Sequence, residues 1–405
     1  MVVPPFMRVT FSTIFYSVTA IFLLVQIAAC EKNQPTALAS APTTAAALGK
    51  LIFHDTSLSA SGVMSCATCH SPAHAHAQPN SLSVQFGGAT MDQPGTRAVP
   101  SLRYMQKTPP FSIDSEGTPS GGFNHDGSAE TLAIQVERPL LAANEMANGT
   151  RTRVVEKIRQ ASYASAFKKI YGEHSLEHVD TAFMHLSEAL QEYQLQAEEF
   201  HPFNAKYDFY LAGKAELSPA EMRGLKLFNE EKRANCAACH PSEKGSDGSS
   251  PLFTDFTYDA LGVARNQAIA ANADSARFDL GLCQSGRLGK AAEPTSCGKF
   301  KVPTLRNVAT RQVFFHNGQI KNLRDAVTFY VSRDTHPEAW YPIVQGKVQK
   351  FNDLPKSHHK NVNVQESPYD RKPGQKPVLS DQEIDDLVAF LQTLTDGYDP
   401  SQKSK

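Results

Sequence analysis

The stretch that decides the fold is SCATCH at Ser65–His70, which returns as NCAACH at Asn235–His240. Both copies have the pattern C-x-x-C-H, in which two thiols join the vinyl groups of a haem and the adjacent histidine reaches its iron. A four-cysteine zinc site would need a second cysteine pair near each copy, and the sequence has none there. The pattern therefore predicts two covalently bound haem c groups. The predicted haem-binding residues are Cys66, Cys69, His70, Cys236, Cys239 and His240.

The sequence around the two motifs also repeats. Three matched segments occur in the same order in each half of the chain, which is typical of a duplicated unit. We therefore predict two homologous haem domains, at residues 46–205 and 206–397, followed by a tail at 398–405. The matched pairs are Gly49–Phe53 with Gly224–Phe228, Val99–Arg103 with Val302–Arg306, and Phe123–Gly127 with Phe314–Gly318.

Helical signals dominate the predicted domains. In HVDTAFMHLSEALQEYQLQ, residues 178–196, the apolar residues Phe183, Leu186 and Leu190 recur at helical spacing. SPAE at Ser218 and SDQE at Ser380 are capping boxes that begin helices. Strand signals are weak, so the sequence predicts an all-α fold.

The N-terminus predicts export. Arg8 precedes an apolar run that ends in IAAC, with small residues before Cys30, as in bacterial lipoproteins. We expect residues 1–29 to be a lipoprotein signal peptide, Cys30 to be acylated, and residues 30–45 to be a flexible tether. The protein would then lie in the periplasm and contact a bacterial membrane only through this lipid. The alternative is an uncleaved anchor, since residues 9–29 are long enough to span a bilayer.

The net charge of the chain and its two remaining cysteines lead to two further expectations. The 405 residues carry a formal net charge of -1, which implies no general attraction to nucleic acid. Cys283 and Cys297 lie fourteen residues apart in a Gly/Ser-rich stretch. In an oxidising compartment we expect a disulfide between them, worth about 3 kcal/mol, rather than two free thiols.

Beyond the paired motifs, LGKLIFHD, FKVPTLRN and FHNG in this chain resemble the bacterial di-haem cytochrome c peroxidases and their relative MauG. The resemblance covers nearly all of the chain after its N-terminal segment. It implies two class I cytochrome c-like haem domains packed with the haems at their interface. It also implies that one haem reacts with peroxide and the other transfers electrons.

In the second half, the resemblance places the sixth iron ligand fourteen residues after His316, at Tyr330. The family uses methionine or tyrosine there, and this chain has no methionine after Met222. A tyrosine ligand favours oxidised iron and implies a low potential. The alternatives are that Tyr330 is a core aromatic and that His316, His336 or water binds the iron.

In the first half, the equivalent position is Pro139, which cannot bind iron, so an open haem face is expected. The resemblance assigns the catalytic acid–base role to Glu145 and a supporting role to Gln135. A carboxylate above open iron can move a proton between the two peroxide oxygens. The alternatives are a solvated surface Glu145 and a helix-surface Gln135.

Three departures from the family pattern stand out. His125 occupies the place of the usual inter-haem tryptophan, and the chain's one tryptophan is Trp340, so His125 itself is a candidate relay. Ala98 replaces an asparagine that binds calcium in the family, which leaves calcium doubtful and dependent on carbonyls near Arg311 and Val313. His74 and His76, after the first motif, could contact haem propionates, lie in solvent or cap the iron.

The sequence therefore predicts a di-haem c-type peroxidase that reduces hydrogen peroxide to water. Electrons would come from a small cytochrome c or cupredoxin, enter through the C-terminal haem and reach peroxide at the N-terminal haem. One alternative is a MauG-like oxidase that modifies a partner protein. Another is a plain di-haem electron-transfer cytochrome. The oligomeric state stays open, with a homodimer as one option.

Overall fold

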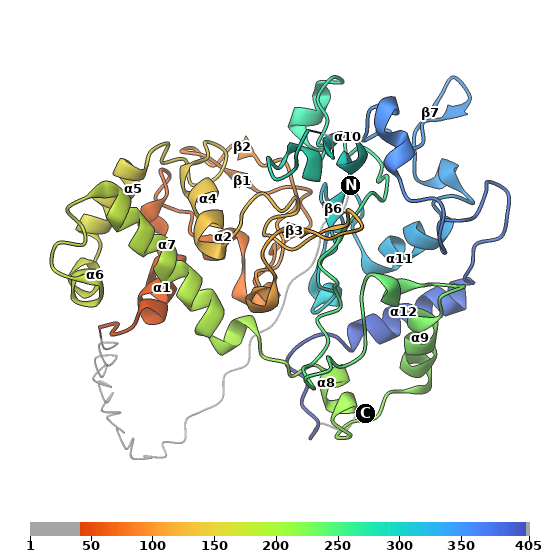
Figure 1. Cartoon of the computed structure of the whole chain (residues 1–405), viewed down its shortest axis with the longest axis horizontal. Helices are drawn as coiled ribbons and strands as arrows, with labels where there is room; N and C mark the ends of the chain where they lie inside the picture. The colour runs from red at the N-terminus through yellow and green to blue at the C-terminus, as the bar shows by residue number, and fades with distance from the viewer. Residues whose placement is uncertain (1–40, 291, 402–405) are drawn as a thin grey trace, which may run out of the picture. The chain divides into compact units, whose positions relative to one another are not determined.

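A computed structural model of the chain describes residues 41–290 and 292–401 (Figure 1). The predicted signal peptide, Cys30 and residues 31–40 of the predicted tether lie outside the described residues. From Ala41 onward the chain forms one compact unit. Among the described helices, none has the length and apolar character that a membrane crossing requires.

Helices are the main regular structure of the described chain, in agreement with the predicted class. Ser218 and Ser380 begin two of them, and each serine hydroxyl accepts a hydrogen bond from a glutamate amide three residues on, as the capping boxes predict. The helices are α1 (Ala45–His54), α2 (Cys66–Cys69), α3 (Leu132–Gln135), α4 (Glu137–Leu141), α5 (Arg151–Gln160), α6 (Ala164–Tyr171), α7 (Val179–Gln196), α8 (Lys206–Leu211), α9 (Pro219–Asn229), α10 (Glu293–Ser296), α11 (Leu323–Ser332) and α12 (Asp381–Gln392).

Short antiparallel ladders join the loops between these helices. Each strand has two residues, which is too short to produce the alternating pattern that would reveal it in a sequence. The pairs are β1 (Phe86–Gly87) with β2 (Gln93–Pro94), β3 (Ser112–Ile113) with β4 (Pro119–Ser120), β5 (Tyr258–Asp259) with β6 (Phe300–Lys301), and β7 (Ile343–Val344) with β8 (Lys347–Val348).

Two large hydrophobic cores follow the two halves of the chain. One contains buried residues from Leu48 to Phe200, and the other contains buried residues from Tyr207 to Leu394. The boundary between them falls where the sequence repeat divides. The assignment of each half to a separate haem domain stays a prediction.

A glycine sits at the tightest helix contact of each core. A Cβ on Gly49 of α1 would lie 1.9 Å from the carbonyl oxygen of Ala189 on α7, and one on Gly224 of α9 would lie 2.0 Å from that of Asp386 on α12. Figure 1 shows α1 beside α7 and α9 beside α12. The matched LGKLIFHD and RGLKLFNE segments therefore place the same kind of helix pair in both halves.

The two halves exchange a matched pair of backbone hydrogen bonds. The amide of Ala98 donates to the carbonyl of His316 at 2.7 Å, and the amide of Lys301 donates to the carbonyl of His125 at 2.8 Å. Ala98 and Lys301 occupy equivalent positions before the V-P-x-L-R segments, and His125 and His316 are also equivalent. We call this region the junction. Each half donates one hydrogen bond to the other through the same position of the repeat, so the two contacts are related by an approximate two-fold symmetry.

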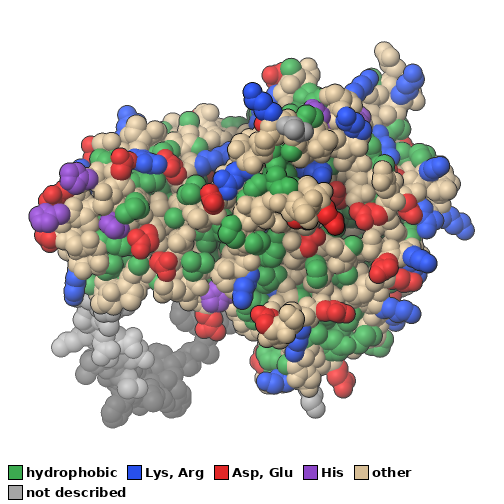
Figure 2. Space-filling view, in the orientation of Figure 1, with side chains coloured by type: hydrophobic (Ala, Val, Ile, Leu, Met, Phe, Trp, Pro, Cys, Tyr) green, Lys and Arg blue, Asp and Glu red, His purple; other side chains and the backbone are tan. Residues whose placement is uncertain are grey.

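Charged side chains of both signs are interspersed over the face seen in Figure 2. This mixture agrees with the near-zero net charge of the sequence.

Candidate haem sites

The first C-x-x-C-H motif forms α2 and the residue that follows it. The amide of Ser65 donates to the Thr68 hydroxyl at 2.9 Å, which fixes the start of this short helix. The Nδ1 of His70 lies 3.1 Å from the Pro100 carbonyl oxygen and 3.3 Å from that of His76. Burial lowers the pKa of His70 to about 4, so Nδ1 carries the single proton and Nε2 is free to bind a metal.

The second motif repeats this arrangement. The Nδ1 of His240 donates to the Phe253 carbonyl at 2.7 Å, and the Pro303 carbonyl also contributes. Burial lowers the pKa of His240, which keeps the ring neutral. Pro100 and Pro303 are the equivalent prolines of the two V-P-x-L-R segments. Both histidines are therefore oriented in the way that iron-binding histidines require.

The four motif thiols form no disulfide. Burial raises the pKa of Cys66 to about 12, of Cys69 to about 11, and of Cys236 and Cys239 to about 12. Paired protonated thiols suit addition to the vinyl groups of a haem, and Cys236 and Cys239 also line a cavity. No cluster of three or more metal-binding side chains accompanies them in the part of the chain that the structure describes, so the zinc alternative gains no support.

A cavity of about 320 Å³ adjoins the second motif. Its volume is within the usual range for cofactor sites. Cys236, Cys239 and His240 line it together with Tyr330, which lies on α11. The residues present therefore fit a covalently attached haem, with the His240 imidazole as one iron ligand.

Tyr330, the second ligand that the sequence predicts, lines the same cavity as His240. Burial raises its pKa above the ordinary range, and the nearby Asp259 and motif thiols add to the rise. His316 also lines the cavity, but its ring stacks on Phe300 at 3.6 Å between centroids. His336 is outside the cavity lining, with its Nδ1 3.0 Å from the Thr335 hydroxyl. The Tyr330 assignment stays a prediction that this arrangement supports.

The first half differs at the equivalent helix. α3 and α11 begin at Leu132 and Leu323, each seven residues after the equivalent histidine, but the first helix is interrupted at Val136. Pro139 lies on the second fragment, α4, where the other half carries Tyr330. The first half therefore offers no iron ligand at this position.

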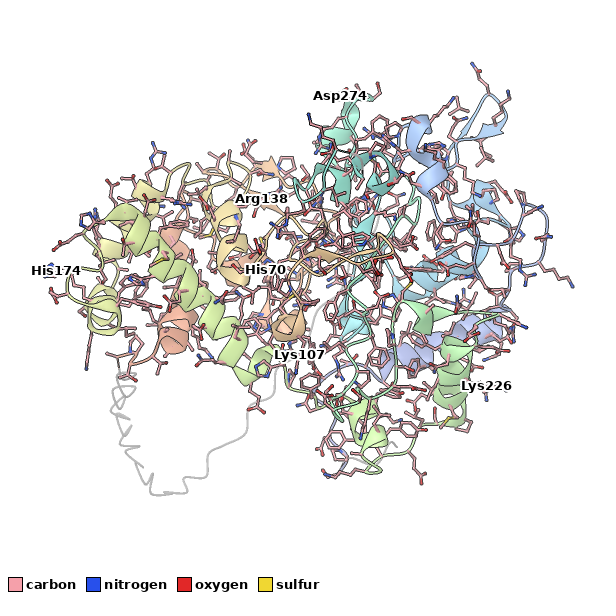
Figure 3. The ribbon with its side chains drawn as sticks, in the orientation of Figure 1. His70, Lys107, Arg138, His174, Lys226 and Asp274 are labelled. Carbon is pink, nitrogen blue, oxygen red and sulfur yellow. A yellow bond between two sulfur atoms is a disulfide. The ribbon has the colours of Figure 1, made fainter. Side chains whose placement is uncertain are left out.

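Glu145 lies near the first motif. Burial raises its pKa, and its charge in turn raises the pKa of the Cys69 thiol. Its Oε1 is 3.8 Å from the Nε of Arg138, and the Glu145 side chain remains 36% exposed. Figure 3 shows Arg138 on α4 and His70 after α2 in the same half. Gln135 ends α3 and lines the cavity. The structure thus places Glu145 near the first motif, whereas Gln135 lines the cavity that the second motif adjoins. Their acid–base roles stay predictions.

Two further candidates take different positions. His125 lines the cavity, and its Nε2 donates to the Ala98 carbonyl at 2.9 Å. His76 is fully buried and stacks on Phe200 at 4.0 Å between centroids, so the expectation of solvent exposure is wrong for this residue. The His76 carbonyl lies beside the Nδ1 of His70, as the Phe253 carbonyl lies beside the Nδ1 of His240. His76 therefore occupies the position that the aromatic residue Phe253 occupies in the second half.

The carbonyls considered for calcium contact a side chain of the protein itself. The guanidinium of Arg311 donates from Nε to the Val313 carbonyl at 3.3 Å and from a terminal nitrogen to the Val99 carbonyl at 3.2 Å. Of the carbonyls considered for calcium, that of Val313 therefore already has a donor.

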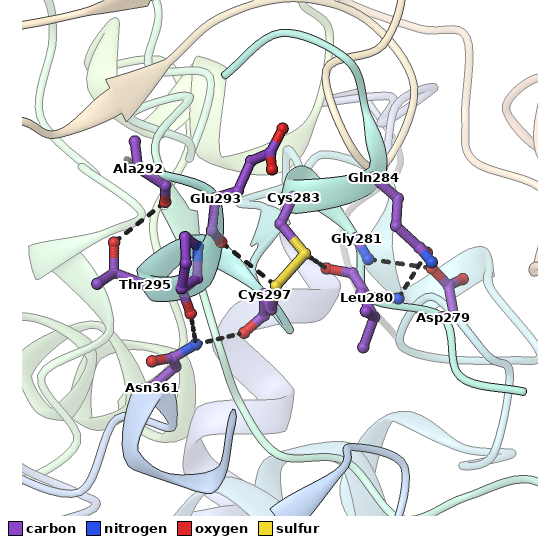
Figure 4. Close-up of a disulfide and its surroundings, with 11 residues drawn as sticks. Asp279, Leu280, Gly281, Cys283, Gln284, Ala292, Glu293, Thr295, Cys297 and Asn361 are labelled. Carbon is purple, nitrogen blue, oxygen red and sulfur yellow. Dashed lines mark hydrogen bonds between the residues drawn. A yellow bond between two sulfur atoms is a disulfide. The ribbon is translucent and has the colours of Figure 1, made fainter. Parts of the chain in front are cut away.

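Cys283 and Cys297 are joined in a disulfide, as predicted (Figure 4). The Asn361 side chain donates to the carbonyls of Cys297 and Pro294 at 3.0 and 2.8 Å. These hydrogen bonds hold the disulfide-closed loop against a segment some sixty positions later in the chain.

Two charged residues near these sites were absent from the sequence-based candidates. Arg138 faces Glu145, and the half-buried Lys301 lines the cavity. Lys301 stands in FKVPTLRN at the position where the first half has Ala98. A charge that is present in only one of two matched segments could have marked Lys301 as a candidate residue. Arg138 gave no such signal, because only folding brings it beside Glu145.

Comparison with known proteins agrees with this geometry. Residues 43–216 match the family described as di-haem cytochrome c peroxidase. The methylamine utilization protein MauG of Paracoccus denitrificans is 34% identical over 88% of this chain and 89% of its own length. Cytochrome c551 peroxidase of Nitrosomonas europaea is 26% identical over 78% of this chain and 82% of its own length. The crystal structure of the di-haem peroxidase BthA from Burkholderia thailandensis has 40% identity and a TM-score of 0.81, covering 87% of this chain and 86% of that one.

The helical fold and the haem motifs thus define a c-type haem oxidoreductase. The chain belongs to the di-haem cytochrome c peroxidase and MauG family, which confirms the resemblance drawn from the sequence. It is an enzyme of the di-haem peroxidase type.

Proposed function

We propose that the protein reduces hydrogen peroxide to water at the first haem, with electrons that enter through the second haem from a small cytochrome c or cupredoxin. The observation that carries this proposal is the contrast between the halves. Glu145 lies near the first motif, where Pro139 occupies the position at which the second half carries Tyr330 and would offer the iron no ligand. Tyr330 shares the cavity of the second motif. One haem is then open to substrate and the other is coordinatively closed.

When bound, the haem iron supplies the electrons that cleave the O–O bond. The protein supplies the proton movement. The Glu145 carboxylate takes a proton from the near oxygen of peroxide and returns it to the far oxygen, which leaves as water. The raised pKa of Glu145 suits this exchange, because a carboxyl group that titrates closer to neutral both accepts and donates protons readily.

Gln135 and Arg138 support this step. The Gln135 amide orients peroxide by a hydrogen bond, and the Arg138 charge favours the ionised form of Glu145. At the second haem, a Tyr330 phenolate would close the iron to peroxide and stabilise its oxidised form. This division of labour also argues against a plain electron-transfer cytochrome, which needs no acid–base residue.

Steady-state peroxide consumption by the Glu145→Gln enzyme, with a chemical reductant, tests the proposal. The amide keeps the size and polarity of the side chain but is no base, so turnover should fall by about 10²–10⁴-fold. Both haems should remain attached, as intact mass and pyridine haemochrome spectra would report, and cyanide should still bind the first iron. Gln135→Ala should cost roughly tenfold, because it removes one positioning contact. A Glu145→Gln enzyme with more than about half of wild-type turnover would refute the acid–base role.

A MauG-like oxidase that modifies a partner protein is the second candidate. It is favoured by the 34% identity to MauG and by Tyr330 in place of a methionine ligand. Peroxide turnover with reduced cytochromes and cupredoxins separates the two functions. A peroxidase turns over with one of these donors. An oxidase consumes peroxide only with its protein substrate, whose mass then changes.

We further propose that the mature protein begins at an acylated Cys30 and is anchored to a bacterial membrane on the periplasmic side. The IAAC sequence supports this proposal. Intact mass of protein extracted from membranes decides it: an unmodified Cys30, or a soluble product cleaved elsewhere, would contradict it.

A further inference from the structure

Arg311 is a positive charge without an acidic partner at the junction. Among the described residues it forms no ion pair, whereas Arg97, also at the junction, bonds both Asp126 and Asp279 at 2.6 to 2.7 Å. Burial is the only cause that changes the Arg311 pKa, lowering it to about 10. A partly buried cation that lacks a counter-ion loses hydration without compensation, so its retention calls for a ligand of opposite charge.

The geometry of the guanidinium indicates where that ligand lies. Of its five N–H groups, one reaches the Val313 carbonyl and one the Val99 carbonyl. The other three find no acceptor within the described chain. Arg311 lines the same cavity as His240, which residues of both halves enclose, so these donors are available on the cofactor side. Two parallel N–H groups of a guanidinium match the two oxygens of a carboxylate.

The repeat shows that this charge is specific to one half. Arg311 follows Arg306 of VPTLR by five residues, and the equivalent position after VPSLR is Thr108. Lys301 is likewise unmatched, with Ala98 as its equivalent, and its ammonium donates only to the Gly122 carbonyl. The second half therefore supplies both of these cations to the junction.

We propose that Arg311 binds a propionate carboxylate of the haem held by His240, and that its charge raises the reduction potential of that haem. The carboxylate completes the hydrogen bonds of the guanidinium, while the Val99 contact ties the same group to the first half. This proposal rests on haem binding at the second motif but not on peroxide as the substrate. The potential measurement can therefore contradict this proposal without contradicting peroxide reduction, and the reverse.

The test is a spectroelectrochemical titration of the di-haem holoprotein. Arg311→Gln keeps two hydrogen-bonding groups but removes the charge that favours the reduced iron. The low-spin haem should become at least tenfold harder to reduce, which is about 59 mV for one electron. Arg311→Lys restores the charge and should stay within threefold of the wild-type equilibrium. Arg223→Gln is the matched control, because Arg223 pairs with Asp386 and does not line the cavity.

A low-spin haem whose potential is unchanged in Arg311→Gln would overturn the proposal, even if the variant were less stable to heat. An equal shift in Arg223→Gln would overturn it as well, since net charge alone would then explain the result. If Arg311→Gln yields no di-haem protein, Arg311→Lys decides: a tenfold or larger change despite the retained charge contradicts the proposal.

Discussion

The Nε2 of His125 lies 2.9 Å from the carbonyl oxygen of Ala98, whose amide in turn donates to the carbonyl of His316 at 2.7 Å. A side chain of one half is thus linked through a single residue to the backbone of the other half. Burial is the main cause that lowers the pKa of His125 to about 3, and the Arg97 charge contributes, so the ring is neutral when it makes this bond. The contact lies where the family usually carries a tryptophan between the haems.

His125→Phe should slow electron transfer between the haems. The phenyl ring fills the space but cannot bond Ala98, so the hydrogen-bonded link from the His125 side chain to the second half is lost and transfer should be slower. Stopped-flow reduction through the second haem, followed at the first, gives the rate. An unchanged rate would place the electron route elsewhere. Cyanide binding to the first haem should not change, which controls for damage to that site.

Tyr330→Phe should convert the low-spin ferric signal of the second haem into another species, because the phenyl ring offers no oxygen to the iron. Electron paramagnetic resonance of the resting protein is the measurement. Tyr369→Phe is a close control, since Tyr369 also lines the cavity and its ring centroid is 6.0 Å from that of Tyr330. Identical spectra of the wild type and the Tyr330 variant would disprove the ligand assignment.

Peroxide turnover should fall in acid as Glu145 becomes protonated, since only the carboxylate accepts a proton. Burial raises the Glu145 pKa, so this acid limb should lie above the usual range of glutamate. Arg138 opposes the rise, and Arg138→Gln should therefore move the limb to still higher pH. The pH–rate profiles of both enzymes give the answer. Arg153→Gln, on the exposed surface of α5, should leave the profile unchanged. If the acid limb does not move in Arg138→Gln, Arg138 and Glu145 do not interact in solution.

Calcium should have little influence on this enzyme. The Arg311 guanidinium already occupies the Val99 and Val313 carbonyls, and a second cation there would meet its positive charge. We expect the spectra and turnover of the purified protein to be the same in EGTA and in calcium. Activity that disappears in EGTA and returns with added calcium would contradict this expectation.

Gly224→Ala should destabilise the second core. The added Cβ would lie 2.0 Å from the Asp386 carbonyl oxygen, so α9 must move away from α12. Overpacking of this kind costs about 1–3 kcal/mol in the free energy of unfolding. Denaturant unfolding followed by circular dichroism measures the loss. Gly289→Ala is the control because nothing lies within 4 Å of its Cβ position; equal stability of the two variants would contradict the packing argument.

Local signals predicted the parts of the fold that local chemistry fixes. The capping boxes at Ser218 and Ser380 begin α9 and α12, because the serine and the glutamate three residues on satisfy amides that the helix leaves free. The haem motifs and the Cys283–Cys297 pair are equally short-range patterns. The apolar spacing of Phe183, Leu186 and Leu190 likewise gave the buried face of α7.

Relationships between the halves were beyond the reach of the sequence. Spacing along the chain could not show that Ala98 bonds His316 or that Arg311 reaches Val99. These contacts depend on how two helical units meet, which packing decides. His76 was left open for a related reason: a histidine between polar residues gives no sign that its ring stacks on Phe200.

The exchanged bonds of the junction have a consequence for the origin of the chain. A symmetric homodimer makes each interface contact twice, once in each direction, and the pairs Ala98–His316 and Lys301–His125 have this reciprocal form within one polypeptide. They are what gene fusion of two copies of a self-associating single-haem ancestor would leave. Fusion also frees the copies to diverge. Pro139 and Tyr330 could then arise at one ancestral site, an asymmetry that identical subunits cannot encode.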